Sequence, residues 1–237
     1  MDARTLLVKN GNAAVLQTLR PALVLRRSVR AASRLGGAPR APHGWRWPVA
    51  DDGRSLSLLA QFELDAQTAA VLELPRAGLL TIFYDSVGAP WLARQDALHV
   101  ELFAESVTTT VSTPDDCDRF DEVGVALSEA ELPRLGVPAP GGIETFCAVQ
   151  EALDPRQAPL SFLGGHAFPL QEPMEDVCAE VEPSVLAADW RLLLQLDTDR
   201  GPGFSWGSGS GRLYVWLPHE DLRRGVFDRV VAIVQDT

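Results

Sequence analysis

The sequence predicts a fold of short β-strands accompanied by a few short helices. Apolar residues gather in short runs that Gly, Pro or Asp ends, as at residues 56–64 (LSLLAQFEL) and 78–84 (GLLTIFY). Such runs are typical of strands. A glycine-rich stretch, residues 201–211, also separates apolar residues 190–197 from 213–217 and excludes a helix between them. This part of the chain therefore predicts two strands joined by an elaborate loop.

The remaining elements follow from spacing and from residues that stop helices. Leu98, Val100 and Leu102 alternate with polar residues, as a half-buried strand requires. The further strands are predicted at residues 22–28, 98–102, 107–112, 123–127 and 227–235, with 107–112 paired to 98–102. The short helices are predicted at residues 12–19, 65–74, 143–153 and 220–224.

Residues 33–48 are predicted to be irregular. Their glycines and prolines surround Trp45 and Trp47, and they exclude both a helix and a central strand. Because tryptophan is large and mostly apolar, we expect this segment to wrap over the core.

Two parts of the sequence resemble each other. LGG occurs at residues 35–37 and 163–165, and LLAQFELD at 58–65 resembles LLLQLDTD at 192–199. The order and the spacing of these matches are nearly constant, although short leucine-rich strings also match by chance. We therefore predict one unit over residues 1–237, with an internal duplication of about 33–111 and 160–237.

Gln61 and Gln195 are equivalent positions of the two similar segments, and each lies inside a predicted apolar strand. A buried glutamine amide needs hydrogen-bond partners. We expect each side chain to bind irregular backbone, such as the nearby Gly-Gly loop, and not to act in catalysis.

Charge and composition limit the partners. A net charge of −11 disfavours direct nucleic-acid binding, which needs clustered positive charge. It fits either simple solubility or electrostatic docking on a basic partner. No apolar run is long enough to span a bilayer, and the first residues lack the apolar centre of a signal peptide. We expect a cytoplasmic protein that does not bind membranes.

The same stretches resemble a known family. SRLGGAPRAPHGWRWP, LLAQFELD, LPRAGLLTIFYD, LGGHAFPLQEPMEDVC, WRLLLQLDTD and GRLYVWLPHEDLRRGVFDRVVAIVQ are similar to the YwqG-like bacterial domain family, of unknown function, over residues 33–235. The residues that carry this resemblance are Gly36, Gly37, Pro39, Trp47, Pro48, Gln61, Gln195, Asp197, Asp199, Trp206 and Gly207.

The resemblance implies an α+β fold of mostly antiparallel sheets with few short helices, here as two related halves packed as one unit. It also implies a role in bacterial toxin–immunity systems. One departure is that the family commonly has an aspartate after the Trp-Gly of the final loop, where this chain has Ser208.

No catalytic residue, metal or cofactor is predicted. The G-x-S-x-G string around Ser205 runs into a strand, not into the helix that a hydrolase elbow requires. Asp197 and Asp199 could bind a hard cation such as calcium, but carboxylates of this kind more often cap loops or pair with arginine.

The leading interpretation is a non-enzymatic binding protein, most specifically an immunity protein that neutralises a cognate bacterial toxin such as a basic nuclease. The predicted contact residues form an acidic loop, Asp115, Asp116, Asp118, Asp121 and Glu122. The alternative is a small-ligand or metal-binding domain, either a simple binder or an enzyme, that uses the loop of Asp197, Asp199 and Trp206.

Overall fold

The structure is a computed structural model that describes residues 5, 13–94, 96–104, 109–134 and 159–237. Its main sheet has 11 strands in the order β6-β13-β12-β11-β10-β1-β9-β2-β4-β5-β7. These strands are β1 (Arg20–Arg27), β2 (Ser33–Leu35), β4 (Ser57–Leu64), β5 (Gly78–Tyr84), β6 (Leu92–Ala93), β7 (Leu98–Phe103), β9 (Val123–Leu132), β10 (Phe162–Gly164), β11 (Trp190–Asp197), β12 (Arg212–Pro218) and β13 (Val231–Gln235). A second small sheet pairs β3 (Arg40–Ala41) with β8 (Thr109–Thr110).

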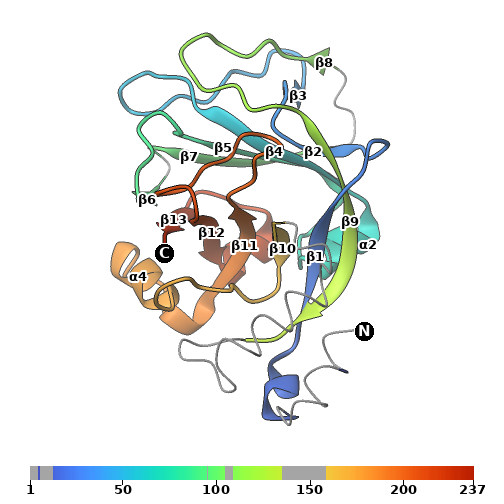
Figure 1. Cartoon of the computed structure of the whole chain (residues 1–237), viewed down its shortest axis with the longest axis vertical. Helices are drawn as coiled ribbons and strands as arrows, with labels where there is room; N and C mark the ends of the chain where they lie inside the picture. Colours follow the sequence, from blue (N-terminus) through green and yellow to red (C-terminus); the bar gives the residue numbers. More distant parts are fainter. Residues whose placement is uncertain (1–4, 6–12, 95, 105–108, 135–158) are drawn as a thin grey trace.

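The fold is mostly β, so the predicted α+β class is wrong. The described helices are short, with at most seven residues each, and they form no layer of their own (Figure 1). They are η1 (Ala13–Thr18), α2 (Ala66–Val71), α4 (Glu175–Val181), η2 (Ala187–Asp189) and α5 (His219–Arg224). None of these described helices is long and apolar enough to cross a lipid bilayer.

The main sheet curls on itself until it is nearly closed (Figure 1). Its two edge strands, β6 and β7, are consecutive in the chain, and a short connection brings them together. Near this connection the Asp85 amide donates to Ala97 O at 2.9 Å, and the Val234 amide donates to Trp91 O at 2.9 Å. The chain itself therefore almost closes the gap between the two edges.

The two ends of the sheet are built alike. β2-β4-β5-β7 forms one antiparallel array and β10-β11-β12-β13 forms the other, with β1 and β9 paired between them. The register shifts between Leu58 and Ala60 in the first array, and between Leu192 and Leu194 in the second. A duplication would leave this pattern, but the shared origin of the two halves stays a prediction.

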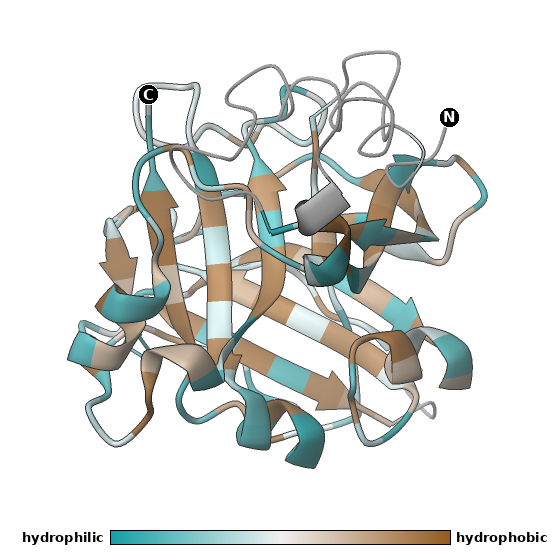
Figure 2. Ribbon diagram, turned by 90° about the horizontal axis from the view of Figure 1, so that it is seen from below, coloured by the Kyte–Doolittle hydropathy of each residue, from teal (hydrophilic) through white to brown (hydrophobic). Residues whose placement is uncertain are grey.

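The core lies inside the curled sheet. Leu59, Phe62, Leu193 and Leu196, all nearly or fully buried, belong to one apolar cluster that both arrays share. Figure 2 shows the apolar strands of the two arrays crossing one behind the other. Both arrays contribute to this cluster, so the two halves depend on each other to bury the faces that meet inside the sheet.

Segments outside the strands cover the outer faces of the sheet. Trp45 and Trp47 pack on Phe83 with ring centroids 5.6 and 5.3 Å away, so this part of residues 33–48 covers the core as expected. The exclusion of a central strand from residues 33–48 is wrong, because Ser33–Leu35 forms β2 between β9 and β4. On the other array Met174 and Cys178, at the start of α4 and within it, cover the outer face. One face is therefore covered by a loop and the other by a short helix.

Two expected strands differ in detail, and one expected helix is not tested. β8 is only two residues long and pairs with β3, so the predicted pairing of 107–112 with 98–102 is wrong. β9 continues beyond residue 127 because it pairs with β1 along that strand's whole length. The helix predicted at residues 143–153 lies outside the described residues.

Candidate functional site

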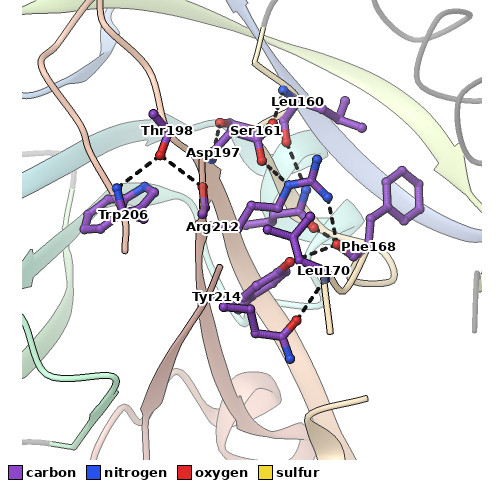
Figure 3. Close-up of polar contacts among 12 residues, drawn as sticks. Leu160, Ser161, Phe168, Leu170, Asp197, Thr198, Trp206, Arg212 and Tyr214 are labelled. Atoms are coloured by element: carbon purple, nitrogen blue, oxygen red, sulfur yellow. Dashed lines mark hydrogen bonds and ion pairs between the residues drawn. The ribbon is translucent and has the colours of Figure 1, made fainter. Parts of the chain in front are cut away.

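Asp197 lies at the end of β11, directly opposite Arg212 on β12 (Figure 3). The Nε of Arg212 donates to Asp197 Oδ1, and the amide of Leu160 donates to Asp197 Oδ2 at 2.7 Å. The Nη1 of Arg212 and the hydroxyl of Tyr214 both donate to Phe168 O at 2.8 Å. Burial raises the pKa of the Asp197 carboxyl, and the Arg212 guanidinium opposes that shift. This buried ion pair holds the segment 160–168 against the sheet.

Asp199 is turned to a different arginine. Its carboxylate forms an ion pair with Arg27 of β1 and accepts a hydrogen bond from the Gly201 amide at 2.8 Å. Its carbonyl accepts from the Phe204 amide at 2.8 Å. In the described part of the chain, no group of three His, Cys, Asp or Glu side chains is arranged to hold a metal ion. The structure therefore does not favour the cation site considered for Asp197 and Asp199.

Trp206 is a core side chain, only 5% exposed. Its ring stacks on Phe204 at 5.7 Å and meets Tyr84 edge-on at 5.8 Å. Its amide donates to Thr198 Oγ1 at 3.1 Å, which fixes the loop across its own base (Figure 3). Because the ring is buried, Trp206 is not available as a contact for a large partner.

Asp236 brings a carboxylate to Ser208 in the final loop. The amides and hydroxyls of the loop meet Asp236, which accepts from the Ser208 amide and from the Ser210 hydroxyl, the latter at 3.2 Å. Gly207 has a φ of +56°, and a Cβ there would overlap the Asp236 side chain. These hydrogen bonds lower the pKa of Asp236, so it stays ionised in the loop.

Gln61 and Gln195 are fully buried and bind backbone. Gln61 accepts from the Arg40 amide and donates to Arg40 O, both at 2.8 Å. Gln195 accepts from the Phe168 amide at 2.9 Å and donates to Leu160 O at 3.0 Å. Arg40 and Phe168 each lie three residues beyond a Gly-Gly pair. Each glutamine therefore fastens the chain that leaves its Gly-Gly turn, as expected of a buried amide.

The remaining motif residues also shape the backbone. Gly36 and Gly37 have φ values of +60° and +77°, where a side chain would be strained. The Trp47 indole donates to Leu56 O at 2.8 Å. The carbonyls of Pro39 and Pro48 accept amide hydrogen bonds from Val111 and Leu56.

We use the name acidic segment for residues 115–122, which carry the five predicted contact residues. Those side chains, Asp115, Asp116, Asp118, Asp121 and Glu122, are all exposed. The backbone beneath them is fixed, because the Asp118 amide donates to Ser57 Oγ at 3.0 Å and the Asp121 amide donates to Pro202 O at 2.9 Å. Three of the carboxylates also accept hydrogen bonds, Asp115 from Arg119, Asp116 from the Ser55 amide at 3.1 Å and Asp118 from the Ser86 hydroxyl at 2.7 Å.

A hollow of about 390 Å³ lies beside the acidic segment. Asp118, Ser205 and Trp91 line it, and Trp91 is 57% exposed. No histidine lines this hollow, and His219 instead binds Glu73 at 2.8 Å. Ser205 therefore has no base beside it, and the described residues form no hydrolytic triad here.

The sequence does not predict a large cavity that the structure contains. It measures about 680 Å³, its walls are mostly apolar, and Arg20 and Arg191 are among its lining residues. An arginine that precedes a proline at the start of a strand is a common pattern, so no signal in the sequence marks it.

Comparisons with known proteins place the chain in a family. No curated protein matches it. A family model described as a domain of unknown function, DUF1963, matches residues 33–235. This match includes every residue that carries the resemblance described above, together with the acidic segment. The chain belongs to the DUF1963 family.

Proposed function

We propose that this protein is a non-enzymatic binding protein and, most specifically, a cytoplasmic immunity protein that neutralises a cognate bacterial toxin. The observation that carries the proposal is the acidic segment. It presents five exposed carboxylates on a backbone that hydrogen bonds hold in place. Because little ordering is needed when such a surface binds, a basic partner would lose less entropy there than on a mobile loop.

The charge of the whole chain supports the same proposal. A net charge of −11 attracts a basic partner over distance and speeds the encounter. The exposed Trp91 and the adjoining hollow supply the apolar contact that charge alone lacks. The inference that the partner is a toxin, like the resemblance to the YwqG-like family, depends on the sequence motifs alone.

The alternative, a ligand or metal site at Asp197, Asp199 and Trp206, lacks such support. Both carboxylates are engaged by arginines and the indole is packed in the core. We therefore favour a binding surface outside that loop.

The test uses the product of the adjacent gene. Co-expression with this protein should rescue growth, and the two should form a complex. A triple variant, Asp115→Lys, Asp121→Lys and Glu122→Lys, should weaken that complex at least about tenfold, with a smaller effect at high salt. These three carboxylates are chosen because none of them accepts a backbone hydrogen bond from another segment.

The matched control carries the same charge change on the face near α4. Glu172→Lys, Asp176→Lys and Glu180→Lys alter three exposed carboxylates there and should leave the affinity within about threefold. If both triple variants weakened the complex equally, the effect would come from net charge alone. That result would contradict the proposal that the acidic segment contacts the partner. An adjacent product that is harmless to cells would contradict the immunity function.

A further inference from the structure

The cavity beside the start of β1 has the size and the lining of a ligand site. It opens between α2, the start of β1, the end of β9 and the start of β11. Its volume of about 680 Å³ falls in the range of small-molecule sites. Leu72, Leu192, Leu193 and Leu222 form its walls, and each is less than 5% exposed. The cavity therefore offers an apolar surface that the fold itself does not fill.

Arg20 gives this cavity a half-buried cation. Its side chain lines the cavity, and within the described chain no hydrogen-bond acceptor contacts its guanidinium. Burial lowers the pKa of Arg20 and the charge of Arg191 lowers it further, whereas the charges of Glu73 and Glu175 partly oppose this shift. A guanidinium normally binds a carboxylate or phosphate when it is withdrawn from water. An anion at this position would relieve both costs.

Arg191 lies at the same end and is held in position. Its Nη1 donates to Ala188 O and Trp190 O, both at 2.9 Å. Its Nη2 lies 3.4 Å from His219 Nδ1, and His219 Nε2 lies 2.8 Å from Glu73 Oε2. In the tautomer that satisfies both contacts, His219 accepts from Arg191 and donates to Glu73. The second guanidinium is therefore fixed by the fold and does not depend on a ligand for its place.

Glu73 is strained at the rim of this cavity. Its φ is +58°, in the left-handed region where glycine usually ends a helix. The cost of that conformation is offset by the hydrogen bond to His219. Backbone strain of this kind is common at functional sites. Here it places the Glu73 carboxylate, which binds His219, near Arg20 and Arg191.

The other carboxylates of the cavity lie at its exposed rim. Glu129 accepts a hydrogen bond from Gln67, and Glu131 is exposed to solvent. They repel a second anion, whereas Arg20 and Arg191 attract one anionic group to the same cavity. This arrangement fits a ligand with a single anionic group and an uncharged body.

We propose that this cavity binds a small monocarboxylic acid, with its carboxylate between Arg20 and Arg191 and its apolar body against the leucine walls. The site does not include the acidic segment, so this proposal is tested separately from the proposed immunity function. A guanidinium and a carboxylate form two parallel hydrogen bonds, which fixes the orientation of the bound acid.

The test measures binding of sodium octanoate by calorimetry and by thermal shift. Octanoate should bind with one molecule per chain and raise the melting temperature, whereas octylamine, with the same body and opposite charge, should not. Arg20→Gln should weaken octanoate binding about tenfold or more. Without ligand the same variant should be about as stable as the wild type, because Arg20 is only partly buried and no described hydrogen bond of its guanidinium is lost.

Two further variants separate the site from general effects. Leu222→Trp fills the cavity and should abolish octanoate binding. Arg224→Gln removes an exposed arginine of the same helix and should bind octanoate like the wild type. Unchanged affinity in Arg20→Gln, equal binding of octylamine, or no binding of octanoate by the wild type would each overturn the proposal.

Discussion

Asp197 and Asp199 are two residues apart, yet their surroundings give them different energetic weights. Arg212, the partner of Asp197, is 6% exposed, whereas the side chain of Arg27, the partner of Asp199, is 52% exposed. Removing one member of a buried pair leaves the other charge without a partner or water. An exposed arginine regains its water, so its lost pair costs little.

We therefore expect Asp197→Ala to lower the free energy of unfolding by about 3–5 kcal/mol, and Asp199→Ala by only about 1 kcal/mol. Urea denaturation measures both. The double variant Asp197→Ala with Arg212→Met should recover much of the loss, because no unpaired charge remains. Equal losses for the two single variants would mean that the Asp197 pair is not the buried anchor.

His166 gives the protein a pH dependence. Burial first, and then the charges of Arg20, Arg134 and Arg191, lower the pKa of its imidazole from about 6.5 to about 4. The folded state therefore binds fewer protons than the unfolded state between these two values. Its contribution to stability is fully present above pH 6.5 and is lost as the pH falls toward 4.

His166→Gln should flatten this dependence, since glutamine can still donate to Thr18 O but cannot take up a proton. The wild type should lose on the order of 2 kcal/mol more than this variant between pH 7 and pH 4. Urea denaturation at the two pH values measures the difference. His43→Gln, at an exposed histidine, should keep the wild-type profile, and an unchanged profile in His166→Gln would contradict the assignment.

At the scale of the element, the Gly-Gly turn depends on space as well as on φ. Gly36 and Gly44 both have positive φ, of +60° and +80°. A Cβ at Gly36 would overlap the carbonyl oxygen of Asp121, whereas a Cβ at Gly44 meets no atom within 4 Å. The two positions thus share backbone strain and differ in packing.

Gly44→Ala should lower the free energy of unfolding by about 1 kcal/mol, the cost of an alanine in the left-handed region. Gly36→Ala should lower it by at least about 2 kcal/mol more, because the segment before β9 must also move. Thermal or urea denaturation of the two variants isolates the packing term as their difference. Equal losses would show that the turn can shift away from Asp121 without cost.

The elements that the sequence predicts well are those whose signals are local. Residues 78–84 form β5 because β-branched and aromatic residues run between two turn signals. Local pattern does not choose partners, so the pairing of β8 with β3 and the length of β9 were not found. The fold class failed for the same reason, since only long-range pairing makes one curled sheet from so many short strands.

The candidate sites divide in the same way. The sequence singles out Asp197 and Asp199 but cannot name their partners, because Arg27 lies on a strand far away in the chain. It misses Arg20 and Arg191 because nothing in the sequence links the two residues, and only the curling of the sheet brings them to one cavity. Contacts between distant segments, and not residue types, mark these positions.

At the scale of the whole molecule, the two arrays are tied together by exchanged strands. β1 pairs with β10 of the far array, and β9 pairs with β2 of the near one. The apolar cluster inside the sheet draws on both arrays. Opening one array would expose the interior of the other, so the protein should unfold as a single cooperative unit.

Hydrogen exchange under native conditions tests this coupling. The slowest amides of β4 and of β11 should exchange with the same opening free energy. Leu59→Ala removes a fully buried side chain of β4 and should lower both values by the same amount, about 2–4 kcal/mol. Leu186→Ala, at a side chain that is 74% exposed, should change neither. If Leu59→Ala weakened β4 alone, the arrays would open separately, and the exchanged strands would serve as a hinge between two independent units.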